Sequence, residues 1–291
     1  MPRLRPLLVL LACLLPACAQ TGERPQPDGL RRTKREEQVI AWENRGEGAE
    51  ALVFVHGWAG DHSVWSKQMD SLAPWRRIAI DLPGHGASDS PRVAYTVGRM
   101  VDALLAVLDD AHVSRAVLIG HSNGAIVARR FLELHPERVA GLVVVDGPLR
   151  SFFDSPEQAR AFVEPLAGRG WREWAAKLVD SMLVPVHAAA DRQRLRALML
   201  DHEQHVLLSS FKGTLAPELW RDQPIRGPLM LVLARQPAWE GEYRAYCERL
   251  CPGLRWEMLD HVSHFLMLDE PERFDALMRD FLVKQAPFAR P

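Results

Sequence analysis

Short apolar runs and amphipathic stretches alternate along this chain from about residue 38 onward. The apolar runs end at Gly or Pro signals, as buried parallel strands do, and lie at residues 52–55, 77–80, 116–119, 142–145, 229–233 and 255–259. Apolar residues spaced three or four apart predict helices at residues 96–111, 123–134, 243–250 and 271–283. This alternation predicts the α/β class, with a mostly parallel central sheet and helices on both faces.

One segment interrupts the alternation. Residues 149–217 show helical patterns but no strand signal, and they lie between two predicted core strands. We therefore expect a helical cap at residues 149–217, folded over the carboxyl edge of the sheet. The core would then come in two parts, residues 37–148 and 218–291.

The first residues have the layout of a secretory signal peptide. Arg3 and Arg5 precede an apolar run at residues 7–15, which is too short for a bilayer that needs about 20 residues. We expect residues 1–17 to be the signal peptide of an exported protein. Residues 18–36 combine Pro, Gly and charge without periodicity, which predicts a flexible tether.

The cleavage site allows two interpretations. Residues 15–18 read Leu-Pro-Ala-Cys and resemble a lipobox, after which Cys18 would be acylated and the protein would be a membrane-anchored, periplasmic lipoprotein. Residues 17–19 read Ala-Cys-Ala and would also suit an ordinary signal peptidase, which would leave a soluble, secreted protein. Lipidation at Cys18 is the preferred interpretation.

The net charge of the chain limits the class of partner. Loss of residues 1–17 would move the formal charge from −1 to −3, which is close to neutral and does not suggest nucleic acid as a partner. The expected partner is a small molecule, and a membrane only through the anchor.

Cys247 and Cys251 lie four apart on a predicted helix, where a disulfide would be strained. We therefore favour two unpaired, apolar cysteines on one face of this helix.

The main chemical motif is Gly-His-Ser-Asn-Gly at residues 120–124. It comes directly after a predicted strand and directly before a predicted helix, which is the context that a nucleophile elbow requires. Ser122 is the candidate nucleophile on this sharp turn. The Asn123 amide, at the helix N-terminus, is a candidate donor to an oxyanion.

Two further motifs follow earlier strands. Residues 56–58 read His-Gly-Trp, where the Trp58 amide is the second candidate oxyanion donor, and residues 81–88 read Asp-Leu-Pro-Gly-His-Gly-Ala-Ser. In order and spacing, these motifs and the elbow resemble the α/β-hydrolase superfamily, in its single-chain serine esterase, lipase and haloperoxidase-like branch. The resemblance covers about residues 39–282 and implies the α/β-hydrolase fold with a helical cap insertion.

The resemblance also places the general base. Residues 261–266 read His-Val-Ser-His-Phe-Leu, and together with residues 269–274 they are similar to the ending of family members. The match assigns the catalytic histidine to His264. His261 is the rival, but it occupies the position of the family's glycine.

No cofactor or metal is expected. His202 and His205 lie three apart on a predicted cap helix and could suggest a metal site, but the sequence offers no third ligand beside them. The family's acyl-transfer chemistry needs no cofactor.

The acid is where this sequence departs from the family pattern. Family members usually carry an Asp a few residues past the strand that corresponds here to residues 229–233. Residues 234–240 read Ala-Arg-Gln-Pro-Ala-Trp-Glu, with Pro237 where the Asp would fall. A histidine base that becomes charged during the reaction still needs a carboxylate partner.

Three carboxylates are candidates for that role. Asp146 stands at the end of the preceding strand, from which some branches of the superfamily take the acid, and it is the first choice. Glu240 could reach in on the loop as the alternative acid, and Asp260 is a weaker third choice. The sequence leaves all three open.

These features predict a serine hydrolase that cleaves ester or related acyl bonds of a small to medium, apolar substrate through an acyl-enzyme. A carboxylesterase-like activity comes first. Carbon–carbon bond hydrolase, lactonase and perhydrolase activities share the same triad and stay open as alternatives. An inactive hydrolase fold that serves as an envelope binding protein is the alternative from another class.

Overall fold

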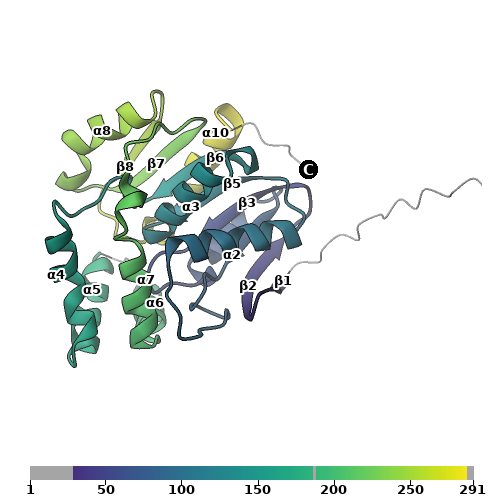
Figure 1. Ribbon diagram of the computed structural model, residues 1–291. Helices are drawn as coiled ribbons and strands as arrows, with labels where there is room; N and C mark the ends of the chain where they lie inside the picture. Colours follow the sequence, from purple (N-terminus) through teal and green to yellow (C-terminus); the bar gives the residue numbers. More distant parts are fainter. Residues whose placement is uncertain (1–28, 186–187, 287–291) are drawn as a thin grey trace, which may run out of the picture.

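The computed structural model describes residues 29–185 and 188–286, so the expected signal peptide and Cys18 lie outside the described residues. The centre of the described part is one eight-stranded sheet (Figure 1) with the order β1-β2-β4-β3-β5-β6-β7-β8. The strands are β1 (Gly29–Arg35), β2 (Gln38–Arg45), β3 (Glu50–Val55), β4 (Arg77–Ile80), β5 (Arg115–His121), β6 (Val139–Val145), β7 (Leu229–Ala234) and β8 (Arg255–Leu259).

The sheet is mostly parallel, which confirms the predicted fold class. From β4 across to β8 every neighbouring pair of strands is parallel, whereas β1 and β2 form an antiparallel extension that pairs with β4. The carboxyl ends of β3, β5, β6 and β7 therefore open at the same edge of the sheet. The segments at residues 56–58, 120–124 and 234–240 lie at the carboxyl ends of three of these strands.

Strand β1 corrects the expected extent of the tether. Residues 29–35 lie in the 18–36 segment that the sequence predicted to be flexible, yet all seven pair with β2. Its side chains carry no apolar alternation, so the strand has no sequence signal of its own. It forms because β2 offers a free edge two residues further along the chain.

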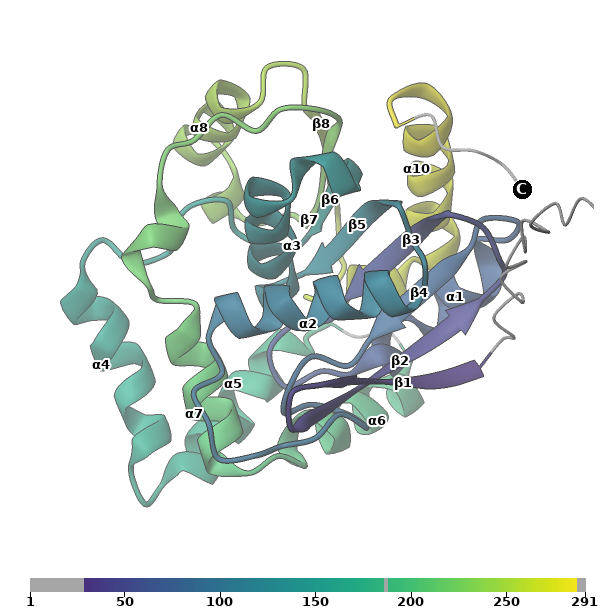
Figure 2. The same ribbon diagram turned by 45° about the vertical axis from the view of Figure 1, so that its right-hand side comes forward.

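Helices cover both faces of the sheet (Figure 2). Side chains on β3 alternate between the two: Val53 and Val55 belong to the apolar cluster under α2 and α3, and Leu52 and Phe54 belong to the one under α1 and α10. The core helices are α1 (Ser66–Ser71), α2 (Val97–Asp110), α3 (Asn123–Leu134), α8 (Glu242–Leu250), α9 (Leu266–Asp269) and α10 (Pro271–Lys284).

Four further helices form a layer at the carboxyl edge of the sheet, and all lie within residues 149–217. They are α4 (Pro156–Ala167), α5 (Trp171–Met182), α6 (Ala189–Leu200) and α7 (Gln204–Gly213). Polar contacts tie this cap to loops of the core: the Trp58 indole donates to the Leu207 carbonyl at 2.9 Å, and Tyr95 N–H donates to Ser209 Oγ at 2.8 Å. The described helices include none that is long and apolar enough to cross a membrane.

The loop at residues 81–88 is organised by the carboxylate of Asp81. Asp81 accepts from the backbone N–H groups of His62 and Ala87, and one of its oxygens lies 2.8 Å from His62 Nδ1. A Cβ on Gly86 would meet this carboxylate at 2.4 Å, and Gly86 has a positive φ of 54°, so glycine is required there. The Asp81 carboxylate thus holds the loop at residues 81–88 against the loop that carries His62.

Candidate active site

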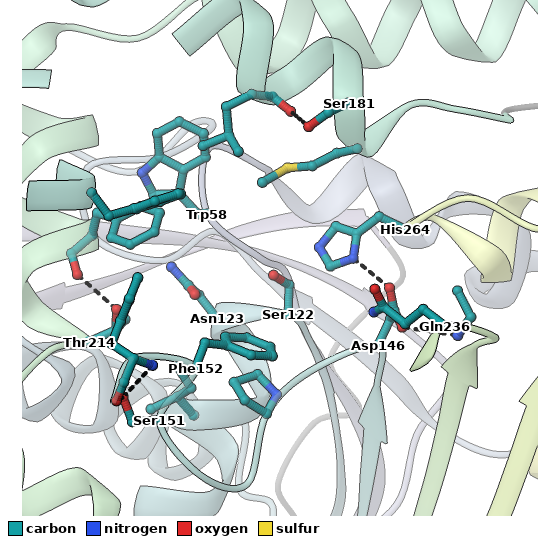
Figure 3. A pocket seen from close by; sticks show the side chains of 18 of the residues that line it. Trp58, Ser122, Asn123, Asp146, Ser151, Phe152, Ser181, Thr214, Gln236 and His264 are labelled. Atoms are coloured by element: carbon teal, nitrogen blue, oxygen red, sulfur yellow. Dashed lines mark hydrogen bonds and ion pairs between the residues drawn. The ribbon is translucent and has the colours of Figure 1, made fainter. Parts of the chain in front are cut away.

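Ser122 occupies a strained turn between β5 and α3. Its φ of 53° and ψ of −120° are rare for a residue with a side chain. The turn fits because a Cβ on Gly120 would lie 2.5 Å from the Gly124 carbonyl oxygen, and one on Gly124 would lie 2.3 Å from the Val55 carbonyl oxygen. Both glycines of the motif are therefore needed for α3 to pack this close to the sheet, with the Ser122 side chain facing the cavity above (Figure 3).

The structure brings Asp146 and His264 together. One Asp146 carboxylate oxygen, Oδ2, lies 2.6 Å from His264 Nδ1, and the Asp146 side chain is only 4% exposed (Figure 3). Asp146 directly follows β6 with a positive φ of 42°, a conformation that Asp adopts more readily than most residues. This backbone turn aims the carboxylate across the end of β7 toward the loop that carries His264.

The two rival carboxylates lie elsewhere. Glu240 Oε1 accepts a hydrogen bond from Arg235 at 3.0 Å, and Asp260 forms an ion pair with the same guanidinium. Both side chains are about half exposed. The structure therefore places Asp146, and neither Glu240 nor Asp260, against His264.

His121, which belongs to the elbow motif, holds the backbone of the His264 loop. Its Nε2 lies 2.8 Å from the His264 carbonyl oxygen, so this nitrogen carries the proton and donates. Burial, together with the nearby His264, holds the pKa of His121 well below its usual value. His121 is thus a neutral donor that joins the serine turn to the histidine loop.

The two candidate oxyanion donors are present at the same site. The Trp58 and Asn123 side chains line one cavity with Ser122, and within the described part of the chain neither backbone amide donates to another protein group. The Trp58 indole donates to a carbonyl of α7 and meets Phe211 edge-on at 5.7 Å between ring centroids. The loop that carries the Trp58 amide is therefore anchored to the cap.

The cavity over Ser122 and His264 has a volume of about 530 Å³ and lies between core and cap. Among the described lining residues, Arg235 is the one lysine or arginine, and Glu240 and Asp260 both engage it. Six aromatic side chains dominate the walls: Trp58, Phe152, Phe153, Phe162, Phe211 and Trp220.

The other histidines singled out in the sequence lie outside this cavity. His202 faces the buried His85 ring at 5.1 Å between centroids, and burial lowers its pKa. Nδ1 of His205 lies 3.3 Å from Glu203. Among the described residues, no group of three or more His, Cys, Asp and Glu side chains could hold a metal ion.

Sequence reasoning missed two residues near the site. His121 was treated only as a filler position of the elbow motif. Trp239 was seen only as part of the loop that lacks the family's Asp, although its indole reaches Asp146 at 3.1 Å. Neither contact has a local signal, since each joins segments more than 90 residues apart.

Comparison with known proteins identifies the family. The family model described as alpha/beta hydrolase fold matches residues 50–224, more than half of the chain. The chain belongs to the alpha/beta hydrolase fold family. Membership supports a hydrolase role and confirms the resemblance drawn from the motifs.

Relatives of known name belong to several reaction classes. The chain is 37% identical over 252 residues to 2-succinyl-6-hydroxy-2,4-cyclohexadiene-1-carboxylate synthase of Klebsiella pneumoniae, covering 83% of this chain and 97% of the relative. It is 31% identical over 171 residues to a pimeloyl-[acyl-carrier protein] methyl ester esterase of Yersinia enterocolitica, covering 56% and 64%. It is also similar to the dihydrolipoyllysine-residue acetyltransferase component of the acetoin cleaving system of Cupriavidus necator, at 28% identity over 84% of this chain and 66% of the relative. The corresponding protein of Pseudomonas putida is 39% identical over 37% of this chain and 30% of the relative. The chain therefore spans only part of the length of these two relatives.

Solved structures agree on the fold. The enol-lactonase from Burkholderia xenovorans LB400 superimposes with a TM-score of 0.76 at 19% identity, covering 87% of this chain and all of that one. An esterase from Exiguobacterium antarcticum gives a TM-score of 0.75 at 18% identity, covering 89% of this chain and all of that one. At this identity the likeness concerns the architecture alone.

Proposed function

We propose that this alpha/beta hydrolase is a serine hydrolase that cleaves esters with an apolar acyl or alkyl group. The observation that carries the proposal is the 2.6 Å contact between Asp146 and His264, at the cavity that the strained Ser122 turn also lines. Because the carboxylate binds Nδ1, Nε2 of the imidazole is the nitrogen that can accept the proton of the serine hydroxyl. Strained backbone of this kind is typical of functional sites, which favours an enzyme over a binding protein.

The reaction runs in two acyl-transfer steps. His264 takes the proton of Ser122, whose oxygen attacks the ester carbonyl, while the Trp58 and Asn123 amides donate to the oxyanion. Asp146 stabilises the imidazolium that forms. His264 then protonates the leaving alcohol, and a water molecule releases the acid by the same sequence of proton transfers.

The cavity walls support an uncharged, apolar substrate. Arg235 is already engaged by two carboxylates, so it offers little to a carboxylate on the substrate. This argues against the reaction of the Klebsiella relative, whose named product carries a carboxylate. The methyl ester esterase among the relatives agrees with ester cleavage. Lactones and other acyl compounds of similar polarity are further substrates to test.

A fluorophosphonate probe tests the proposal directly, because only an activated serine reacts with it. The folded wild-type protein should be labelled at Ser122, and Ser122→Ala should lose the label together with ester turnover. Loss of the nucleophile costs several thousand-fold or more in comparable enzymes. Ser181→Ala, which removes another hydroxyl of the same cavity, should keep the label.

A panel of p-nitrophenyl esters then defines the substrate class. We expect kcat/KM to rise from acetate to medium-length or aromatic acyl groups, and to fall when a terminal carboxylate is added to the chain. A wild-type protein that takes no label and hydrolyses no ester of the panel would contradict the proposal.

A further inference from the structure

The last residue of β7 and the loop after it, where the usual family pattern has the acid, supply hydrogen-bond donors here instead. Asp146 Oδ1 accepts from the Ala234 backbone N–H at 2.9 Å and from the Trp239 indole N–H at 3.1 Å. The other oxygen, Oδ2, faces His264. The two oxygens of this carboxylate therefore have separate partners.

The indole of Trp239 is held firmly in this place. Trp239 ends a short 3-10 turn that begins at Pro237, and the residue is only 2% exposed. Its ring packs against Tyr243 of α8 at 4.8 Å and against Phe152 at 5.2 Å between centroids. An N–H on such a fixed ring donates with little loss of conformational freedom.

We propose that Trp239 is a positioning residue for the acid: its indole N–H fixes the plane of the Asp146 carboxylate and stabilises its ionised form, so that Oδ2 stays on His264. The inference rests on the proposed serine hydrolase function. It deepens that function: where family members usually have the acid, in the loop after β7, this chain has a neutral donor. That donor binds Asp146, the carboxylate at the end of the neighbouring strand β6.

Loss of this donor has a defined electrostatic consequence. A hydrogen bond stabilises the ionised carboxylate, so its removal leaves the negative charge of Asp146 less stabilised. The attraction of Asp146 for the proton on His264 Nδ1 should therefore increase. The acidic limb of the pH dependence of kcat/KM, where the base must be deprotonated, should move to higher pH.

The test removes the N–H and keeps the ring. Benzothienylalanine at position 239, with sulfur in place of the indole N–H, preserves the shape of the side chain, and Trp239→Phe is the simpler second variant. Trp256→Phe is the matched control: its ring lies 6.0 Å from Tyr243, and its indole nitrogen has no protein partner within the described residues. Melting curves establish that each variant is folded.

Two readouts are compared in the full-length wild type and the variants. The NMR signal of the proton between His264 Nδ1 and Asp146 should shift in both position-239 variants, and ester kinetics should show a fall in kcat of about tenfold with the acidic limb at higher pH. Trp256→Phe should change neither. A folded benzothienylalanine variant in which this proton signal is unchanged would overturn the proposal.

The two readouts also separate this inference from the function on which it rests. The NMR spectrum needs no turnover, so a shifted proton signal in a protein that cleaves no ester would count against the proposed function alone. Normal labelling and turnover without a change in the proton signal or the pH limb would count against the role of Trp239 alone.

Discussion

At the scale of single residues, Asp146 combines a left-handed backbone conformation with a carboxylate whose two oxygens both have hydrogen-bond partners. Its φ of 42° turns the chain sharply after β6, and Asn also tolerates this conformation better than most residues that have a side chain. The amide of an Asn could keep the contacts to Ala234 and Trp239 through its oxygen. Its nitrogen, however, would donate where Asp146 now accepts from His264.

Asp146→Asn should therefore preserve the fold and impair the reaction. The amide favours the wrong imidazole tautomer, and the equivalent change in another Ser-His-Asp triad lowers turnover by about 10⁴. Steady-state ester kinetics measure the loss, after circular dichroism has shown that the variant is folded.

Glu240→Gln provides the comparison. Its side chain is half exposed and contacts Arg235, so the substitution should leave kcat close to that of the wild type. The reverse result, a severe loss in Glu240→Gln and near-normal turnover in Asp146→Asn, would assign the acid to the loop after β7.

The residues of the site differ in how well the sequence could locate them. Ser122 and His264 each stand in a local motif that reports their position in the fold. The choice between Asp146 and Glu240 depends on contacts through space, because both carboxylates follow strands that end at the same edge. The left-handed turn at Asp146 and the Trp239 indole decide it, and neither can be read from neighbouring residues.

At the scale of elements, the close approach of α3 to β3 is the most demanding contact. A Cβ at Gly124, in the first turn of α3, would lie 2.3 Å from the Val55 carbonyl and 2.5 Å from that of His56. Backbone atoms of a central strand cannot yield as a flexible side chain would. Gly98 stands at the matching place in α2, where the nearest neighbour of a Cβ is the Thr96 hydroxyl oxygen at 3.7 Å.

Gly124→Ala should lower the free energy of unfolding by about 3 kcal/mol or more, because α3 must move away from the sheet. Gly98→Ala should be neutral or slightly stabilising, since alanine is the better helix former. Urea unfolding followed by circular dichroism compares the two. Equal stabilities for both variants would show that α3 can shift at little cost.

The elements themselves followed closely from local patterns. The predicted bounds of β4, α3 and β8 coincide with those of the structure, since apolar runs and helical periodicity report burial directly. Strand β1 was missed because its sequence, Gly-Leu-Arg-Arg-Thr-Lys-Arg, contains one large apolar residue and no alternation. Pairing with β2 makes it a strand, and Thr33 is its one buried residue.

At the scale of the whole molecule, several buried histidines link stability to pH. Burial is the main cause that lowers the pKa of His56, His85, His121 and His202, with His85 and His121 well below the usual value. The unfolded chain then binds more protons than the folded one below about pH 6.5. His62 acts in the opposite direction, because its hydrogen bond with Asp81 raises its pKa.

The protein should therefore lose stability as the pH falls from 6.5 toward 5.5. Each histidine that stays neutral in the fold contributes a slope of about 1.4 kcal/mol per pH unit to the free energy of unfolding. The histidines with a lowered pKa outnumber the one with a raised pKa. Urea unfolding at pH 7.5, 6.5 and 5.5 measures this slope. A free energy of unfolding that stays constant or increases over this range would contradict the expected balance.

Strand β1 has a consequence for how these molecules behave beside one another. It is an outer strand of the sheet, and four of its seven residues are basic: Arg31, Arg32, Lys34 and Arg35. Open strand edges are templates for aggregation, and positive charge on an edge discourages a second sheet from pairing with it. Without this strand, the mostly buried β2 would be the exposed edge. Residues 29–35, which the sequence assigns to a tether, therefore cover by pairing an edge of the sheet that would otherwise be left open, and the folded unit begins no later than Gly29.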